Sequence, residues 1–319
     1  MTDPGLVSVI LPNRDHATFL PNALNAFLNQ TWTHHEIIVI DDASSDESRD
    51  IVQAFAAKDP RVRLLILPSH QGINRAVQHA LGHARGEYVH VAGADDLVQP
   101  HFFEKCVTQL IRFPDAALCF SDPSEFYLER NLLIRFPLYL SKESVHLGKD
   151  DLVALLSKNY FHISANTAVY RLHKFRAAGG YRAELGWLSD WFVTIVLALR
   201  HGACYVPTSL TQVSIRSNSY SAINLSNADA QRRYVDNVVE LLLTPEYADV
   251  VSVMRQAALL PEYHFRTMLW LLASRHGRTF ITIRLIARIL ARAPWSVLRP
   301  YAPVSLRRKL RACWNALRR

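Results

Sequence analysis

The sequence predicts an α/β protein: a Rossmann-like, doubly wound, mostly parallel sheet, with a basic α-helical extension at the C-terminus. Short β-rich apolar runs alternate with amphipathic helical segments over roughly the first 120 residues, which specifies a parallel sheet with right-handed crossovers. Two of these runs end in paired aspartates, at the strand ends where open α/β sheets bind ligands. Beyond residue 263 the chain holds 13 of its 36 basic residues and no acidic residue.

The predicted strands share a short run of branched apolar side chains and occupy residues 6–11, 36–40, 62–67, 87–92 and 117–120. Helical spacing of apolar residues predicts helices between them, at residues 20–28, 51–56, 73–84 and 100–113. Ser44 and Glu47 resemble a capping box that begins the second of these helices. Downstream, a helix is expected at 150–158, a strand at 165–170 and a helix from about 187 to 201. Residues 121–149 show no regular pattern, and we expect an irregular excursion that shapes an acceptor groove.

The composition fits a chain of 319 residues with one large domain and an accessory region, since half of the residues are apolar. The four cysteines form no CxxC pair, which argues against a zinc site or a disulfide framework and favours a reducing compartment. The N-terminus lacks the features of a secretory signal, and no stretch approaches the ~18–20 apolar residues of a membrane span. We therefore expect a cytoplasmic protein.

Asp95 and Asp96 directly follow the strand at 87–92. Adjacent carboxylates repel each other and are costly to desolvate, so this pair implies a cation or a set of hydrogen-bond donors. A divalent cation is the simplest partner, because Mg²⁺ takes one or two carboxylates together with phosphate oxygens of a substrate. The alternative is a solvated turn between strand and loop.

An ordered series of motifs resembles the family 2 glycosyltransferases, inverting enzymes with the GT-A fold. The series reads VSVILP at 7–12, FLNQT at 27–31, EIIVIDDASSD at 36–46, ARGEY at 84–88, GADD at 93–96, GGY at 179–181 and SD at 189–190. The resemblance covers about residues 6–225. It implies a nucleotide-sugar glycosyltransferase domain at residues 1–225 and a separate basic, amphipathic helical region at 226–319.

The resemblance also implies a nucleotide site. In the family, the turn after the first strand contacts the base, and the acids that end the second strand hold the nucleotide. The matching residues here, with a nearby cation on the third predicted helix, are Pro12, Asn13, Arg14, Asp41, Asp42 and Arg75. Judged from the residues alone, Asp42 with Ser44 is equally suited to cap the following helix.

Asp95 matches the last acid of the family's DxD motif, which implies that it binds Mn²⁺ or Mg²⁺ bridging the nucleotide diphosphate. Such a metal offsets the negative charge that develops on the leaving diphosphate. The first acid of the motif is replaced by Gly93, and Asn218 stands where the family often has the histidine of an Arg-x-His loop. The remaining matches, expected beside the donor sugar and diphosphate, are Ala94, Asp96 and Arg216.

Asp190 matches the family's catalytic base, with Ser189 in place of the usual preceding glutamate. An inverting transfer needs one carboxylate to take the proton of the acceptor hydroxyl as its oxygen attacks the anomeric carbon. The alternative role for Asp190 is a helix N-cap.

Two segments of the basic tail, at 279–292 and 306–319, place arginines on one helical face and apolar residues on the other. Basic amphipathic helices of this kind lie in membrane interfaces and are attracted by anionic lipid. We therefore expect peripheral attachment to the inner face of the plasma membrane. The alternatives are a helical subdomain packed on the rest of the protein or a homodimer interface. No nucleic-acid-binding fold accompanies the basic stretch, so nucleic acid is not expected as a partner.

Together these features predict a metal-dependent inverting glycosyltransferase of bacterial surface-polysaccharide assembly. The expected donor is a nucleotide sugar, with a UDP-sugar favoured, and the expected acceptor is a glycan or a lipid-linked molecule. One alternative is a sugar-nucleotide-binding protein that has lost catalysis, because Gly93, Ser189 and Asn218 depart from the family pattern. Another is a nucleotidyltransferase, but the turn at 12–16 lacks the glycine-rich phosphate loop of that class.

Overall fold

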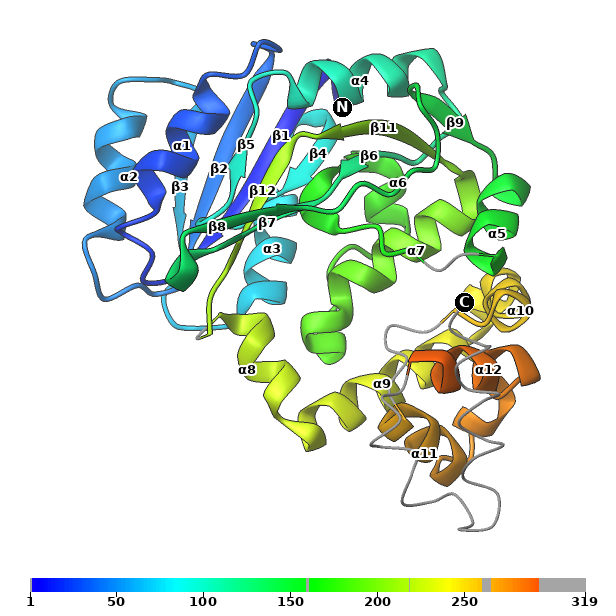
Figure 1. The fold of residues 1–319 in the computed structure, drawn as a ribbon. Helices are drawn as coiled ribbons and strands as arrows, with labels where there is room; N and C mark the ends of the chain where they lie inside the picture. Colours follow the sequence, from blue (N-terminus) through cyan, green and yellow to red (C-terminus); the bar gives the residue numbers. More distant parts are fainter. Residues whose placement is uncertain (1, 159–160, 218, 260–264, 293–319) are drawn as a thin grey trace. The chain divides into compact units, whose positions relative to one another are not determined.

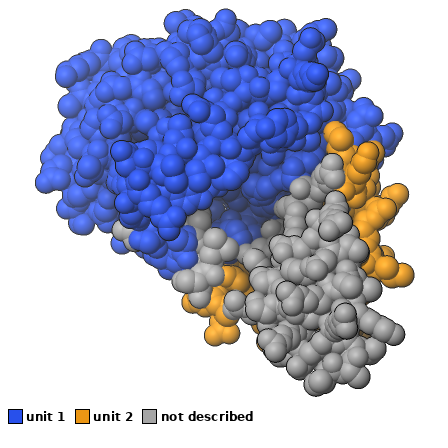
Figure 2. All heavy atoms as spheres, viewed as in Figure 1, with its two compact units in different colours: residues 1–152, 161–226 blue, residues 153–160, 227–319 orange. Residues whose placement is uncertain are grey.

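The computed structural model describes residues 2–158, 161–217, 219–259 and 265–292. The chain separates into two compact units, one of residues 1–152 and 161–226 and the other of residues 153–160 and 227–319. Figure 2 colours these two units. The assignment of a catalytic domain to 1–225 and an accessory region to 226–319 stays a prediction.

An eight-stranded sheet forms the centre of the first unit. Its strands, in spatial order, are β3 (Val62–Ile66), β2 (His35–Asp41), β1 (Asp3–Asn13), β4 (Gly86–Val91), β10 (Ala168–Arg171), β6 (Leu118–Asp122), β11 (Ala203–Ser209) and β9 (Val145–Leu147). Strands β3, β2, β1 and β4 are parallel and lie side by side in Figure 1, whereas β10 and β9 run antiparallel to their neighbours. The mostly parallel sheet confirms the predicted fold class.

The sheet's core is continuous with the helices that flank it. Val7, Val9 and Leu11 of β1 are fully buried, as expected for the central strand of a parallel sheet, and they pack in one cluster with Phe27 and Phe103. The helices and short 3₁₀ segments between residues 20 and 226 are α1 (Leu20–Leu28), α2 (Ser48–Ala56), α3 (Ile73–Leu81), α4 (Phe102–Arg112), η1 (Leu128–Arg130), α5 (Lys149–Lys158), η2 (Ala165–Thr167), α6 (Leu172–Ala177), η3 (Ala183–Leu188), α7 (Ser189–His201) and α8 (Tyr220–Ser226). α5 begins in the first unit and ends in the second.

A second, four-stranded sheet grows from the carboxyl ends of three strands of the first. It consists of β5 (Leu97–Val98), β12 (Thr211–Ile215), β7 (Ser124–Tyr127) and β8 (Leu132–Arg135), in that spatial order. β5, β12 and β7 are the next strands along the chain after β4, β11 and β6, so the second sheet begins at the edge where a ligand is expected.

Two local predictions are wrong. Residues 121–149 are not irregular, because β7 and β8 pair as a hairpin, β7 also pairs with β12, and β9 joins the main sheet. β7 and β9 also have partners far along the chain, β12 and β11, which a local pattern does not reveal. The capping box also fails, because α2 begins at Ser48 and the Ser44 hydroxyl instead accepts hydrogen bonds from Asn13 and Asp15.

The second unit is helical in its described part. It contains α9 (Ala228–Leu242), η4 (Pro245–Tyr247), α10 (Ala248–Ala257), α11 (Phe265–Ala273), η5 (Gly277–Phe280) and α12 (Ile283–Arg292). Leu285 and Ile289 of α12 are fully buried, whereas Ile283 is 89% exposed. At least part of the apolar face of the first basic segment is therefore packed inside the protein, and the second segment, 306–319, lies outside the described residues. Among the helices that are described, none is both long and apolar enough to cross a membrane.

Candidate active site

Asn13 and Asp41 end neighbouring strands and lie opposite each other in the sheet. The Asn13 amide donates to Asp41 Oδ2 at 3.0 Å, and Arg49 Nε donates to Asp41 Oδ1 at 2.7 Å. Burial alone raises the pKa of Asp41, but hydrogen bonds from Ser44, Arg49 and Asn13 outweigh it, so the pKa lies below its usual value. Asp41 Oδ2 thus joins the two strand ends, while Oδ1 holds the following loop and α2 through Ser44 and Arg49.

The neighbouring Asp42 points to a different element. Its Oδ1 accepts from the Gln71 backbone N–H at 2.7 Å, and its Oδ2 accepts from the Gly72 N–H at 2.9 Å and lies 2.8 Å from His70 Nδ1. These groups immediately precede α3, so Asp42 fixes the turn that starts α3. The alternative prediction, that Asp42 caps the next helix in sequence, is wrong.

The other predicted nucleotide contacts lie nearby but are more open. Pro12 is buried in β1, whereas Arg14 is exposed in the turn after it, and Arg75 is exposed in the first turn of α3. The two arginines are therefore accessible cations beside the carboxyl ends of β1 and β2, close in sequence to the groups that Asp41 and Asp42 hold.

The second acid pair is held by β12. The backbone N–H of Ser214 donates to Asp96 Oδ1 at 2.9 Å, the Asn166 amide donates to Asp96 Oδ2, and the Ser214 hydroxyl donates to the Asp95 carbonyl at 2.5 Å. Burial, followed by the charge of Asp95, raises the pKa of Asp96 to about 7 despite these hydrogen bonds. Ala94, between the pair and Gly93, is buried in the core cluster.

Arg216, just beyond β12, forms an ion pair with Asp95. Its Nη2 lies 2.5 Å from Asp95 Oδ2, and each side chain is only 14% exposed. The guanidinium also lies over the Phe19 ring at 4.7 Å and within 3.1 Å of His16 Nε2. The turn after β1 therefore links the two acid pairs, because His16 contacts Arg216 while Asp15 bonds to Ser44 and Ser45.

The donors for a metal ion are few. A Cβ built on Gly93 would lie 2.7 Å from Asp96 Oδ2 and 3.0 Å from Asp95 Oδ1, so an acid does not fit there without a shift. Within the described ranges, no three acidic, histidine or cysteine side chains gather as a metal-binding group. Asp95 already pairs with Arg216, so Mn²⁺ or Mg²⁺ at this carboxylate would have to compete with the guanidinium and draw its other ligands from phosphate oxygens and water, which makes the fit poor.

Asp190 lies in the first turn of α7. Its Oδ1 accepts from the Trp191 N–H at 2.6 Å, and its carbonyl accepts from the Thr194 hydroxyl at 2.7 Å. The carboxyl is partly buried, and burial raises its pKa to about 6. The N-cap of α7 is Leu188, so the alternative prediction of an N-cap at Asp190 is wrong.

A buried asparagine connects α3 to the segment before Asp190. The Asn74 amide donates to the Gly186 carbonyl at 2.7 Å and to the Arg182 carbonyl at 3.1 Å. Gly186 has a φ of 55°, a left-handed value that favours glycine. The Ser189 hydroxyl accepts from the Arg182 N–H at 2.6 Å and closes the same loop. Asp190 is thus positioned from α3, whose start is fixed by Asp42.

The structure therefore brings together Asn13 with Asp41, and Asp95 with Arg216, by direct contact, and it links Asp42 to Asp190 only through α3. Sequence reasoning missed four residues of this network: His16, Asn74, Asn166 and Ser214. One signal in the sequence pointed to His16: position 218 lacks the histidine that the family often has near this arginine. In the structure, His16 places an imidazole beside Arg216 instead, from the turn after β1.

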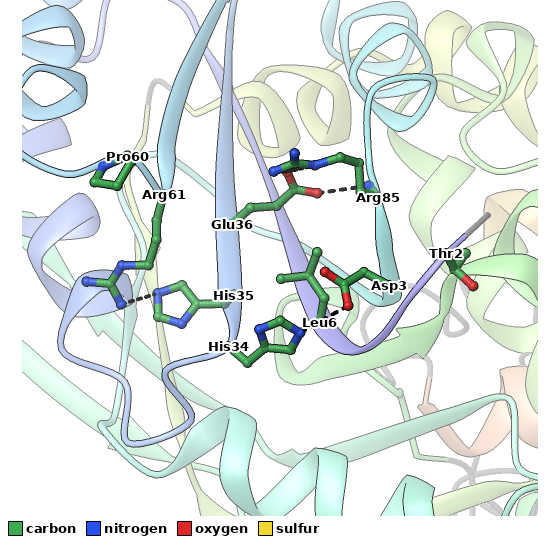
Figure 3. Close-up of a pocket in the computed structure, with 9 residues that line it drawn as sticks. All are labelled: Thr2, Asp3, Leu6, His34, His35, Glu36, Pro60, Arg61 and Arg85. Carbon is green, nitrogen blue, oxygen red and sulfur yellow. Dashed lines mark hydrogen bonds and ion pairs between the residues drawn. The ribbon is translucent and has the colours of Figure 1, made fainter.

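A cavity of about 430 Å³ lies at the opposite, amino-terminal edge of β1 and β2 (Figure 3). Its charged side chains already pair with one another: Arg85 with Glu36, and His34 with Asp3, while Arg61 contacts His35. It contains none of the predicted site residues.

Comparison with known proteins places these features in a family context. The sequence model of the family described as glycosyl transferase family 2 matches residues 8–174. An uncharacterised glycosyltransferase of Escherichia coli (strain K12), YibD, is 28% identical over 284 residues, which cover 83% of this chain and 76% of YibD. The putative teichuronic acid biosynthesis glycosyltransferase TuaG of Bacillus subtilis (strain 168) is 34% identical over 100 residues, which cover 31% of this chain and 40% of TuaG.

Two solved structures are similar in fold. Residues 1–349 of S. aureus TarS, in complex with UDP-GlcNAc, superimpose with a TM-score of 0.67 at 17% identity, covering 96% of this chain and 87% of that one. The mannosyltransferase PcManGT from Pyrobaculum calidifontis, in complex with GDP-Man and Mn²⁺, gives a TM-score of 0.51 at 17% identity, covering 88% and 85%. These similarities confirm the predicted GT-A fold.

Proposed function

The chain belongs to glycosyl transferase family 2, and from that premise we propose that it moves a sugar from a nucleotide-sugar donor to a hydroxyl group of a glycan or lipid-linked acceptor, with inversion at the anomeric carbon. That it is a glycosyltransferase follows from the family. The observation that carries the finer proposal is the linked arrangement of strand-end acids, Arg216 and the first turn of α7 around one edge of the sheet.

The proposed donor is a UDP-sugar, with the turn at 12–14 beside the base and Arg75 as a nearby cation. The UDP-GlcNAc complex of TarS, whose fold is similar over most of the chain, supports a nucleotide sugar as donor. The clamp that Asp41 and Asp42 make with Asn13 and the start of α3 keeps this turn in one conformation. A pre-organised loop of this kind lowers the ordering cost of binding.

We propose Asp190 as the general base. The acceptor oxygen forms a bond to the anomeric carbon, its proton passes to the Asp190 carboxylate, and the bond from that carbon to the diphosphate breaks with its electron pair on the leaving oxygen. A pKa of about 6 suits this role, because the group is ionised at pH 7 yet more basic than an ordinary aspartate. The linkage through Asn74 keeps the first turn of α7 in place.

Family members of the GT-A fold commonly use a divalent metal, and the PcManGT complex contains Mn²⁺. A metal would supply positive charge to the leaving diphosphate. In this chain Asp95 would be its ligand, but Gly93 and the Arg216 ion pair make the donor set a poor fit. The Mn²⁺ or Mg²⁺ site at Asp95 stays a prediction, and no step above depends on it.

The acceptor and location are proposed from the relatives. TuaG is named for teichuronic acid biosynthesis, which supports a role in polysaccharide biosynthesis. We propose attachment of the cytoplasmic protein to an anionic membrane surface through its basic helices. The burial of Leu285 and Ile289 supports the alternative of a packed helical subdomain for the first of those helices. Flotation with anionic and neutral vesicles, comparing the full chain with a truncation after residue 263, distinguishes these readings.

The function is tested by incubating the purified full chain with UDP-, GDP- and dTDP-sugars and measuring nucleotide release with and without lipid-linked acceptors. Release from one donor that depends on an acceptor and is lost in Asp190→Asn supports the proposal. Asp50→Asn, an exposed acid in the first turn of α2, serves as the matched control. Calorimetric binding of a nucleotide sugar with no turnover on any acceptor would instead favour the alternative of a binding protein that has lost catalysis.

A further inference from the structure

We infer that Arg216 supplies the positive charge that stabilises the departing diphosphate in this protein, so that transfer does not require an added divalent metal. The inference rests on the proposed function and deepens it. It follows from three features of the site. Gly93 stands where the family has an acid, Asp95 is already paired with Arg216, and Arg216 and His16 each carry a donor without an acceptor.

The first feature is that packing excludes the missing acid. A Cβ at Gly93 would meet Asp96 Oδ2 at 2.7 Å, closer than real Cβ contacts come. Asp96 fills that space because Ser214 and Asn166 hold its two oxygens. An acid at position 93 would therefore require Asp96 to move away from the groups that now hold its two oxygens.

The second feature is that the remaining carboxylate already has a cation. Asp95 and Arg216 are 2.5 Å apart and mostly buried, and the Phe19 ring supports the guanidinium from one side at 4.7 Å. An arginine keeps its charge at every physiological pH, and its planar fork of donors matches phosphate oxygens in geometry. Arg216 thus brings a fixed positive charge to the carboxylate on which the family's metal is expected.

The third feature is a pair of donors that lack acceptors. Among the described residues, Arg216 Nε and His16 Nδ1 are buried and make no hydrogen bond. Because a guanidinium only donates, the contact between Arg216 Nη2 and His16 Nε2 makes Nε2 the acceptor, which leaves the hydrogen on Nδ1. Buried donors without acceptors are costly, so a side-chain movement that lets oxygens of a nucleotide diphosphate reach them would gain hydrogen bonds.

In the proposed transfer, the electron pair of the broken bond moves onto a diphosphate oxygen. Arg216 stabilises that negative charge electrostatically and donates to the oxygen, while the proton of the acceptor hydroxyl goes to Asp190. Asp95 positions Arg216 and need not contact a metal. No oxidant, reductant or further reactant is needed.

The test compares the purified full chain in excess EDTA and in Mn²⁺, with the best UDP-, GDP- or dTDP-sugar and its acceptor. We expect nucleotide release to agree within about twofold between the two conditions, and UDP to bind with similar affinity in both by calorimetry. Turnover that is lost in EDTA and restored by Mn²⁺ overturns the inference but leaves the proposed function standing. Failure of both binding and turnover in EDTA and also in Mn²⁺ overturns the inference and the proposed function together.

Variants of Arg216 give a second readout. In EDTA, Arg216→Gln should lower kcat by about 100-fold or more and weaken UDP binding, Arg216→Lys should retain an intermediate rate, and Arg112→Gln, an exposed arginine of α4, should behave as wild type. If Arg216→Gln and wild type turn over at the same rate in EDTA, the inference is wrong. Thermal unfolding of each variant controls for folding, and the wild-type comparison stands without any variant.

Discussion

The two aspartate pairs that end β2 and follow β4 look alike in sequence, yet the protein surrounds them differently. Asp41 is held by Asn13, Ser44 and Arg49, and these hydrogen bonds bring its pKa below the usual value in spite of burial. Asp96 is buried beside another acid, and its pKa rises to about 7. The first pair receives most of its bonds from nearby loops, whereas the second depends on Asn166, Ser214 and Arg216.

This difference teaches that a strand-end Asp-Asp pair does not by itself identify a metal site. In the first pair, every carboxylate oxygen holds backbone or side-chain donors, so the pair acts as a clamp on the strand ends and on α3. In the second pair, Asp96 is held by hydrogen bonds, and Asp95 forms an ion pair with Arg216, whose Nε makes no hydrogen bond. The chemistry of the site is therefore expected at the second pair and at Asp190.

The largest expected effect comes from Asp190, an acid outside both pairs. Asp190→Asn should lower kcat by about 1,000-fold, because an amide cannot take the acceptor proton, and should leave UDP affinity nearly unchanged. In the wild type, kcat/KM should fall about tenfold per pH unit below pH 6, because burial raises the pKa of Asp190 to about 6 and the base must be ionised. Nucleotide release and calorimetry across pH 5–8 measure both effects.

The comparison would break if Asp190→Asn kept its turnover while Asp42→Asn abolished it with UDP binding intact. That result would move the chemistry to the first pair. Asp50→Asn should match wild type in every one of these assays, since its carboxylate is exposed.

A carboxylate at position 93 gives the next largest effect. Gly93→Asp should destabilise the protein by about 2–3 kcal/mol, because its Cβ overlaps Asp96 Oδ2 and a third carboxylate joins two others. Gly93→Ala carries the same Cβ without the charge and should cost less. Urea unfolding of both variants measures the difference. Equal stability of Gly93→Asp and wild type, with new Mn²⁺ dependence, would show that the second pair can accept a metal after all.

The link from the first pair to Asp190 is tested by Asn74→Ala. Loss of its two hydrogen bonds to the loop before α7 should destabilise the protein by about 1–2 kcal/mol and lower kcat roughly tenfold. A residue that only stabilises the fold would leave kcat of the folded enzyme unchanged. Measuring kcat and KM where the variant is fully folded therefore shows whether Asn74 positions Asp190 or only stabilises the protein. Asn22→Ala, at an exposed position of α1, is the control.

The smallest effect is a pH dependence of stability with opposite signs at two acids. The lowered pKa of Asp41 stabilises the fold above the unfolded-state pKa, and this contribution is lost as the pH falls, so Asp41→Asn should lose more stability at pH 6 than at pH 3.5. The raised pKa of Asp190 has the reverse effect: stability falls as the pH rises from the ordinary aspartate pKa of 3.8 to about 6, because the folded chain still binds the proton that the unfolded chain has lost, and it levels off above 6. Asp190→Asn should therefore gain a few degrees in Tm relative to wild type between pH 4 and pH 6 and keep that gain at higher pH.

Tm profiles of the two variants beside wild type check this directly. Parallel curves for wild type and both variants over the whole range would mean that neither carboxyl titrates differently in the folded and unfolded chains, contrary to the environments described above.

Much of the fold could be predicted because the spacing of apolar residues along the chain identifies its strands and helices. The apolar runs at 6–11, 36–40 and 62–67 correspond to β1, β2 and β3, and the strand-end acids lie at the expected edge of the sheet. The family and fold class are confirmed. The residues at 121–149 were mispredicted because short strands such as β7 and β9 are defined by their pairing with the distant strands β12 and β11 rather than by their own pattern.

By itself, the sequence determined which acids stand at the strand ends, because the alternation of strands and helices fixes where a parallel sheet exposes its carboxyl edge. Only the tertiary structure decided what each acid does. Asn166, Ser214 and Arg216 reach Asp95 and Asp96 from 70 or more positions away, and His16 reaches Arg216 from 200 positions away. Hydrogen bonds, burial and ion pairing depend on distance in space. The same Asp-Asp sequence therefore holds the strand ends and the start of α3 together at residues 41–42, whereas at residues 95–96 it forms an ion pair with Arg216.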